Sequence, residues 1–316
     1  PSRLAILITH YLLLSITYIC AGIAVALIFT KRIADIGRIY FVDLLGAGTG
    51  AILTYFIIEP LGAPKALVLM SSIMALAGTL FTYYAGRKWL FVTSGALTCI
   101  LALSIMYTNH ILDIQAAGTK ALADALRTKK GADIVSTKWT PLARIDVFEA
   151  DALTHPFMEN SLATDVPGEI VKMITADGDA QTYMFRRPDV RSDLPAPNRE
   201  TLNNYEFSFL LKQAPEVLVI GPGGGNEIFV AHQWGASKVV GVELNRAILD
   251  VTLKEYVEFG GHLYESPIAS AVVADGRSYL ERSDEKFDII QMSGVDTWAG
   301  LSSGAYVLSE NYLYTV

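Results

Sequence analysis

The first third of the chain alternates long apolar stretches with short charged or turn-forming segments. A helix needs about 20 apolar residues to cross the hydrocarbon core of a bilayer. Four stretches approach that length, at about residues 4–30, 39–58, 66–84 and 89–107. A cleavable signal peptide would account for only one of them. The pattern therefore predicts a transmembrane helical domain over residues 1–110, with about four spans.

Beyond residue 110 the apolar runs become shorter and more regularly interrupted. The segment 111–135 is polar and rich in Ala and Lys, so we expect a connecting helix or linker there. Residues 136–200 contain alternating apolar and polar positions with a turn at 176–179, which predicts a small β subdomain. A helix is expected at about residues 201–213.

Residues 201–316 read as a parallel α/β sheet. The apolar run 217–220 leads into a turn made almost entirely of glycine, Gly221 to Gly225. Helix 226–234 should follow it. Further buried strands are predicted at 239–242, 271–275 and 287–291. We therefore expect a Rossmann-like domain, whose closing C-terminal strands are absent because the last helix has barely begun at the end of the chain.

The strand ends carry the chemistry that a nucleoside site needs. Glu243 follows the second strand and lies 18 residues after Gly225, close to the roughly 20-residue offset at which an acid accepts hydrogen bonds from a ribose. Asp275 and Gly276 follow the third strand, and residues 293–298 follow the fourth. Because ligands bind beyond the carboxyl ends of parallel strands, we expect these groups to converge on one crevice.

Charge divides the chain in the same place as the apolar pattern. Residues 1–110 hold seven Lys or Arg and three Asp or Glu, whereas the remainder holds 18 and 29. An acidic soluble part excludes nucleic acid as a partner, since binding it requires a basic face. Cys20 and Cys99 both fall within the apolar stretches and indicate no disulfide framework. The expected partners are the lipid bilayer and a small-molecule or lipid-borne acceptor, together with other membrane subunits.

The charge of the loops and the origin of the cofactor predict opposite orientations of the chain in the membrane. Positive residues concentrate after the first and third apolar stretches, which would place those loops in the cytoplasm and the acidic domain on the opposite side. A metabolic nucleoside cofactor, by contrast, is made in the cytoplasm. We expect an integral protein of the inner or plasma membrane whose soluble domain faces the cytoplasm.

Several motifs, taken in order, resemble spermidine synthase and its membrane-fused relatives, whose membrane part is compared with major facilitator transporters. The stretches that carry the resemblance are 37–47, 140–147, 177–181, 217–225 with Glu243, 275–280, 287–290 and 308–312. The resemblance implies a class I S-adenosylmethionine-binding fold and S-adenosylmethionine or its decarboxylated form as cofactor. It also implies that Glu243 holds the ribose, Asp275 the adenine amino group, and the turn containing Gly221, Gly223 and Gly225 the amino-acid or aminopropyl end, with Gly276 beside Asp275.

The catalytic part of the resemblance is incomplete. Gly224 stands where the family has an aspartate in the glycine turn, and Ser293 stands where the family has the aspartate that deprotonates the amine. A serine hydroxyl is not a general base for an ammonium near neutral pH. Asp296 keeps the second family aspartate and is our candidate catalytic residue. Tyr205 and Trp298 are candidate walls for the acceptor.

Three hypotheses for function follow. The chain is a membrane-anchored transferase with an unidentified acceptor, an enzyme that makes a polyamine with Asp296 in both roles, or a catalytically degenerate structural or regulatory subunit of a membrane complex. A dehydrogenase is disfavoured because Asn226 or Glu227 occupies the place of the third glycine of the dinucleotide motif. The sequence has no metal-ligand spacing, Walker lysine or serine nucleophile elbow.

Overall fold

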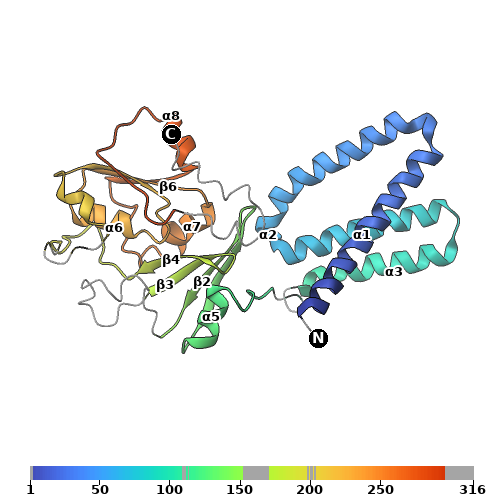
Figure 1. Cartoon of the computed structure of the whole chain (residues 1–316), viewed down its shortest axis with the longest axis horizontal. Helices are drawn as coiled ribbons and strands as arrows, with labels where there is room; N and C mark the ends of the chain where they lie inside the picture. The colour runs from blue at the N-terminus through green and yellow to red at the C-terminus, as the bar shows by residue number, and fades with distance from the viewer. Residues whose placement is uncertain are drawn as a thin grey trace. The chain divides into compact units, whose positions relative to one another are not determined.

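The structure is a computed structural model that describes residues 3–108, 112, 114–151, 171–197, 199, 202 and 204–295 (Figure 1). The chain divides into two compact units, Pro1–Ile57 and Ile58–Val316. The first unit is helical. The second contains further helix followed by two β-sheets.

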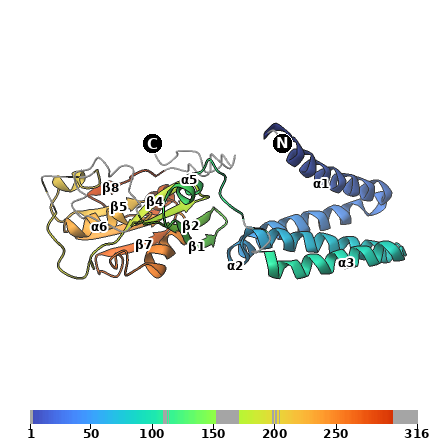
Figure 2. The same ribbon diagram turned by 90° about the horizontal axis from the view of Figure 1, so that it is seen from below.

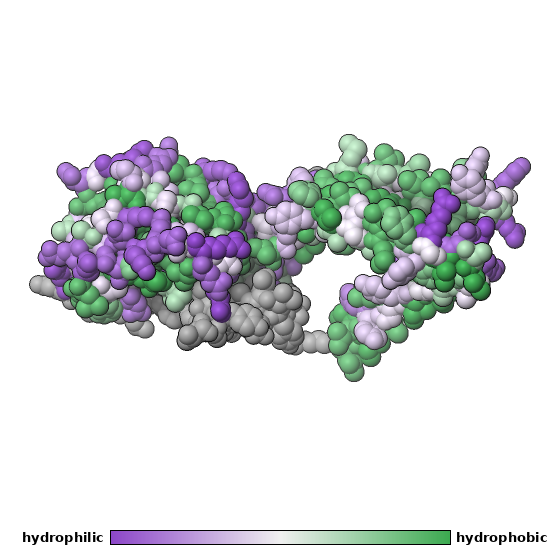
Figure 3. Space-filling view, turned by 90° about the horizontal axis from the view of Figure 1, so that it is seen from above, coloured by the Kyte–Doolittle hydropathy of each residue, from purple (hydrophilic) through white to green (hydrophobic). Residues whose placement is uncertain are grey.

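The first unit contains α1 (Arg3–Lys31) and the first part of α2 (Ile36–Tyr84), separated by a short 3-10 turn, η1 (Ile33–Asp35). The side chains of α1 are apolar and exposed along almost its whole length. A helix that is apolar on every side is typical of a membrane span. Figure 3 shows these apolar surfaces in green over the helices and the hydrophilic surfaces in purple over the sheets.

Three helices of the described chain are long and apolar enough to cross a membrane, at Leu4–Lys31, Ile33–Tyr84 and Lys88–Tyr107. The sequence predicted about four spans, and the difference lies in α2. That helix contains both the second and the third predicted stretches, joined at Gly62, whose φ of 75° is not helical. Pro60 and Pro64 flank this break and each lack the N–H that a continuous helix would use.

In the helical part of the second unit, hydroxyl groups link the end of α2 to the helix that follows it. α3 (Lys88–Ser104) continues into a 3-10 turn, η2 (Ile105–Tyr107). The hydroxyls of Thr79 and Thr98 are 3.1 Å apart, and those of Thr82 and Ser94 are 3.2 Å apart. Such interhelical bonds are a usual way for apolar helices to associate.

The first sheet of the second unit is antiparallel. It follows α5 (Ala121–Thr128) and contains β1 (Asp133–Trp139), β2 (Arg144–Glu149), β3 (Val171–Ala176) and β4 (Ala180–Phe185), in that spatial order. The strands expected around Arg144, Val171 and Gln181 are thus present. Leu122 of α5 packs against Phe148 and Met173 of this sheet, so the helix covers one of its faces.

The second sheet is parallel, with the strand order β7-β6-β5-β8 (Figure 2). The elements are β5 (Glu216–Ile220), α6 (Asn226–Gln233), β6 (Lys238–Glu243), α7 (Arg246–Asp250), the π-helical turn η4 (Val251–Glu255), β7 (Ala269–Val273), α8 (Gly276–Arg282) and β8 (Ile289–Gln291). In chain order these strands lie 3-2-1-4, which matches the first four strands of the Rossmann order. The Rossmann-like fold expected from the sequence is therefore observed.

Alternate residues of β5 face two separate cores. Val217 and Val219 pack with α6 on one face, and Leu218 and Ile220 pack against the side of the sheet that Tyr279 of α8 covers. Residues two apart on a strand share a face, so the uninterrupted apolar run is what a strand buried on both sides requires. The sheet is therefore covered on both faces, which leaves its strand ends for ligands.

The prediction of a helix at residues 201–213 is wrong for the part of that segment that the structure describes. The structure has turns at 204–206 and a single 3-10 turn, η3 (Phe207–Leu210). Phe209 enters the core of the parallel sheet, where it contacts Trp234. Burial of this one aromatic side chain takes precedence over the weak helical periodicity of the segment.

Candidate functional site

The glycine turn joins β5 to α6 through backbone that only glycine adopts readily. Gly221, Gly223 and Gly225 have φ values of 67°, 50° and 88°. A side chain at such angles would crowd its own backbone, which explains the glycines. Gly225 is also the residue that caps the N-terminus of α6. The turn thus places the start of α6 directly beyond the end of β5.

Strand β4 of the antiparallel sheet holds this turn in place. The N–H of Gly224 donates to the hydroxyl of Thr182 at 3.1 Å, and the side-chain amide of Asn226 donates to the carbonyl of Tyr183 at 3.1 Å. A Cβ added at Gly224 would lie 2.0 Å from that same carbonyl oxygen. The contact explains why this position holds glycine, because an aspartate would need β4 to move.

Glu243 closes the turn from the end of β6. Its side chain is only 7% exposed, and its carboxylate accepts from the N–H of Gly223 at 3.4 Å and of Asn245 at 3.0 Å. Burial raises the pKa of this carboxyl, and the backbone donors partly oppose the shift. A carboxylate has about four acceptor positions, and the N–H groups of Gly223, Leu244 and Asn245 occupy three, so one remains for a hydroxyl of a ribose. The structure thus brings the glycine turn and Glu243 together, as the sequence predicted.

The N–H groups of the turn are used within the protein. Gly221 donates to Val242 at 2.8 Å and Gly225 to Pro222 at 2.7 Å, in addition to the bonds of Gly223 and Gly224. These donors hold the turn in shape. Its contribution to a ligand is therefore close approach to bare backbone, which side chains would prevent.

Asp275 caps a helix in the structure. Its side chain accepts from the N–H of Ser278 at 2.8 Å and begins α8, with Gly276 buried as the first helical residue. Asp275 is exposed and, with Tyr279 and Arg282 among others, lines a cavity of about 560 Å³ beyond the end of β7. The N–H of Ala274 bonds to the carbonyl of Glu243 at 3.1 Å, so this strand end adjoins that of β6. The adenine role of Asp275 stays a prediction.

The proposed catalytic residue Asp296 and the proposed wall residue Trp298 lie outside the described residues. Ser293 is described and follows β8. It hydrogen-bonds to Glu227, whose side chain is 5% exposed at the start of α6. Burial is the main cause that raises the pKa of Glu227 to about 7.

Sequence reasoning assigned no role to Glu227, although it directly follows the glycine turn. In a sequence, an acid in the first turn of a helix indicates favourable interaction with the helix dipole. What the sequence could not show is burial among polar groups. Burial and the negative charge of Glu227 raise the pKa of Tyr205. Burial also raises the pKa of Tyr264, and the negative charges of Glu243 and Glu227 raise it further.

Two buried polar atoms of the parallel-sheet domain have no hydrogen-bond partner within the described chain, and one of them belongs to Tyr264, on which the charge of Glu227 acts. They are the hydroxyl oxygen of Tyr264 and the side-chain carbonyl oxygen of Gln291, the last residue of β8. The amide nitrogen of Gln291 donates to the carbonyl of Tyr205 at 3.2 Å, which fixes that side chain. Buried polar atoms are normally paired, so an unpaired acceptor here indicates a place for a donor.

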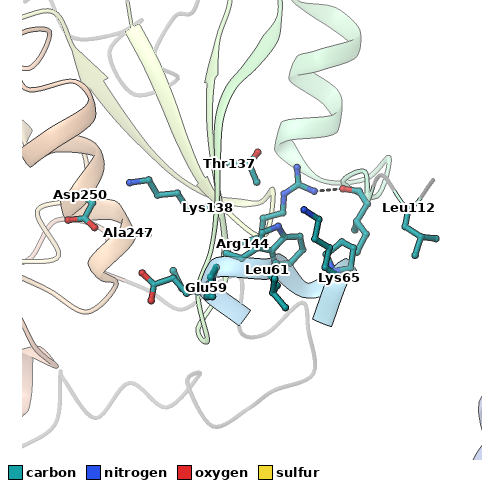
Figure 4. A pocket seen from close by; sticks show the side chains of 15 residues that line it. Glu59, Leu61, Lys65, Leu112, Thr137, Lys138, Arg144, Ala247 and Asp250 are labelled. Carbon is teal, nitrogen blue, oxygen red and sulfur yellow. Dashed lines mark hydrogen bonds between the residues drawn. The ribbon is translucent and has the colours of Figure 1, made fainter. Parts of the chain in front are cut away.

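A second cavity, of about 590 Å³, lies elsewhere in the second unit (Figure 4). Glu59 and Lys65, on either side of the break in α2, line it together with Lys138 of β1, Arg144 of β2 and Asp250 of α7. Figure 4 shows the guanidinium of Arg144 bonded to the carbonyl of Ile114. No residue of the glycine turn lines this cavity. The described residues contain no cluster of His, Cys, Asp and Glu suited to a metal ion.

Known proteins match only part of the chain, and no protein-family model matches it. A polyamine aminopropyltransferase from Korarchaeum cryptofilum is 28% identical over 88 residues, covering 28% of this chain and 27% of that protein. Another, from Thermococcus onnurineus, is 33% identical over 81 residues, covering 25% and 28%. The chain thus spans just over a quarter of the length of these curated relatives.

Among solved structures, a spermidine synthase from Thermotoga maritima has a TM-score of 0.34 at 19% identity, covering 53% of this chain and 49% of that one. A spermidine synthase in complex with the transition-state analogue AdoDATO has a TM-score of 0.32 at 17% identity, covering 50% and 45%. By sequence, the chain is similar to polyamine aminopropyltransferases at low identity and over part of its length.

Proposed function

We propose that this protein is a membrane-anchored transferase that binds decarboxylated S-adenosylmethionine and transfers its aminopropyl group to an amine. The observation that carries the proposal is the buried carboxylate of Glu243, bonded to the glycine turn at the adjoining ends of β5 and β6. The local similarity to proteins named polyamine aminopropyltransferases favours the decarboxylated cofactor over S-adenosylmethionine itself.

The residues divide the cofactor between them. Glu243 accepts a hydrogen bond from the ribose diol, because its carboxylate keeps a free acceptor position and charge-assisted hydrogen bonds are the stronger kind. Asp275 keeps one carboxylate oxygen for Ser278 and presents the other to the adenine amino group. The bare backbone of Gly221 to Gly225 lets the aminopropyl end approach closely. When bound, the sulfonium supplies an activated carbon for attack by the acceptor.

Calorimetry on the full detergent-solubilised chain tests the cofactor assignment. We expect heat of binding with decarboxylated S-adenosylmethionine, weaker binding with S-adenosylmethionine and none with NAD. The product nucleoside then decides the reaction: methylthioadenosine marks aminopropyl transfer, and S-adenosylhomocysteine marks methyl transfer. Absence of binding to all three compounds would overturn the proposal.

A second candidate function is a catalytically degenerate subunit of a membrane complex. Two departures favour it: Gly224, where β4 leaves no room for an aspartate, and Ser293, which has no carboxylate. The same calorimetry separates the two candidates if a diamine is added afterwards. A degenerate subunit binds the nucleoside without releasing methylthioadenosine, whereas the transferase releases it.

The membrane anchor is the helical part of the chain. α1, α2 and α3 are long and apolar enough to span a bilayer, and their exposed side chains are those that lipid would cover. We propose that the domain with the parallel sheet faces the cytoplasm, where the nucleoside cofactor is made.

A further inference from the structure

We propose that Glu227 receives the proton that the attacking amine loses, and that Ser293 and Gln291 help to hold that amine. The inference rests on the proposed transferase function and adds an acceptor site to it. It is motivated by an unassigned buried carboxylate beside the position where the resembled family places its catalytic aspartate.

Glu227 occupies a position next to the cofactor turn. It lies two residues after Gly225, so its side chain starts where the glycine turn ends. Ser293 follows the neighbouring strand β8 and hydrogen-bonds to Glu227, although the two residues are far apart in sequence. The carboxylate of Glu227, on α6, therefore contacts Ser293, the position after β8 where the resembled family has an aspartate.

The cluster around Glu227 is rich in hydrogen-bond acceptors. These are the hydroxyl of Ser293 and the side-chain oxygen of Gln291, which is buried and has no partner within the described residues. The negative charge of Glu227 acts on Tyr205, and those of Glu227 and Glu243 both act on Tyr264. An ammonium brings three N–H donors and one positive charge. A primary amine therefore supplies what the cluster lacks.

Tyr205 and Tyr264 lie close enough to Glu227 for its negative charge to raise the pKa of both phenols. Gly241 lies in the middle of β6, and a Cβ there would be 2.6 Å from the Tyr264 hydroxyl oxygen, so glycine permits the ring to lie against the strand. The carbonyl of Tyr205 is bonded to Gln291. Aromatic rings attract cations, so two tyrosines close to a carboxylate suit the binding of an organic cation.

Attack by the amine forms one bond and breaks another. The nitrogen lone pair attacks the methylene carbon attached to the sulfonium of decarboxylated S-adenosylmethionine and forms a C–N bond. The C–S bond breaks with its electron pair going to sulfur, and methylthioadenosine leaves. A bound ammonium has no lone pair, so it passes one proton to the Glu227 carboxylate before the attack, and the product nitrogen keeps the other two protons as a secondary ammonium. Burial raises the pKa of this carboxyl to about 7, so near neutral pH it can both accept and release the proton.

The test compares Glu227→Gln and Glu227→Asp with the parent chain, with Glu258→Gln as the control at an exposed glutamate. Methylthioadenosine release is measured with 1,4-diaminobutane as the acceptor probe. We expect Glu227→Gln to slow turnover by about 100-fold or more, the usual contribution of a general base, and Glu227→Asp to retain part of the activity. Affinity for decarboxylated S-adenosylmethionine should stay within about threefold in all variants.

Amine binding provides a readout that does not depend on turnover. With methylthioadenosine bound, the parent chain should bind 1,4-diaminobutane, and Glu227→Gln should weaken that binding by at least about tenfold. Unchanged turnover or amine binding in Glu227→Gln would overturn the inference, as would a parent chain that binds the nucleoside but no diamine. Loss of nucleoside binding in Glu227→Gln and Glu227→Asp would instead assign Glu227 a structural role. A parent chain that binds no nucleoside refutes the proposed function itself.

Discussion

Glu243 is the residue on which nucleoside binding should depend most. Glu243→Gln keeps the size of the side chain and one acceptor oxygen but removes the charge. We expect affinity for decarboxylated S-adenosylmethionine to fall by about 2 kcal/mol, roughly 30-fold, because a charge-assisted bond becomes a neutral one. Calorimetry measures the change, with Glu258→Gln as the control. An unchanged affinity would show that the ribose lies elsewhere.

Gly224 tests whether the missing aspartate can be restored. A Cβ at this position collides with the carbonyl of Tyr183, so Gly224→Asp and Gly224→Ala should both be destabilised, by about 3 kcal/mol. Thermal unfolding of the solubilised chain measures the loss. Tighter nucleoside binding by Gly224→Asp, without a loss of stability, would contradict the steric explanation.

Glu227 should make stability depend on pH. Its folded pKa is raised from 4.5 to about 7, so the folded state holds a proton that the unfolded state releases. Stability from this group is therefore complete below about pH 4.5 and is lost as pH rises through about 7, by roughly 3 kcal/mol at most. Glu227→Gln cannot titrate, so its unfolding temperature should vary less between about pH 5 and 8 than that of the parent. Equal slopes would contradict the buried position of the carboxyl.

The sequence predicted the glycine turn and Glu243 because both follow from local pattern. Positive φ favours glycine, and an acid at a strand end about 20 residues later is typical of a ribose site. Glu227 was missed because its significance depends on Ser293, which follows β8 and contacts Glu227 only once β5 and β8 are paired. No spacing along the chain reveals that contact.

At the scale of elements, α8 depends on its cap. Asp275→Ala should cost about 1 kcal/mol through loss of the bond to the Ser278 N–H, whereas Asp275→Asn should keep it, since asparagine caps equally well. If Asp275 also binds the adenine amino group, Asp275→Asn should still weaken nucleoside binding, because its second atom is an N–H donor. Thermal unfolding and calorimetry on both variants separate the two roles. Unchanged nucleoside binding by Asp275→Asn would show that Asp275 only caps α8.

The strands were more predictable than the helices. β5 and β6 are apolar runs buried on both faces, and a pattern so strong allows one interpretation. A helix was expected in the segment before β5, at about residues 201–213. In the structure Phe209 is buried against the parallel sheet, and a single 3-10 turn is enough to place it there. Tertiary contact decided that element.

At the scale of the molecule, α1, α2 and α3 are long and apolar enough to cross a membrane, and the proposed function has lipid cover them. Cys20 and Cys99 lie in α1 and α3, and both are exposed when no lipid surrounds them. In intact membranes a water-soluble maleimide should therefore fail to label either cysteine, and it should label both after denaturation in detergent. Rapid labelling before denaturation would contradict the membrane assignment for that helix.

Maleimide labelling of a cysteine in the α/β domain can also show which side of the membrane that domain faces. Asp284 is exposed just after α8, so a cysteine there in a Cys20→Ser, Cys99→Ser background reports on the side that the α/β domain faces. The charge of the loops and the origin of the cofactor predict opposite sides of the membrane for this domain. We expect the cytoplasmic side, because the proposed nucleoside cofactor is made there and Glu243 is proposed to bind it. A membrane-impermeant maleimide should then label Asp284→Cys in inside-out vesicles and not in intact cells. Labelling in intact cells would place the domain outside and leave the nucleoside site without a cytoplasmic supply.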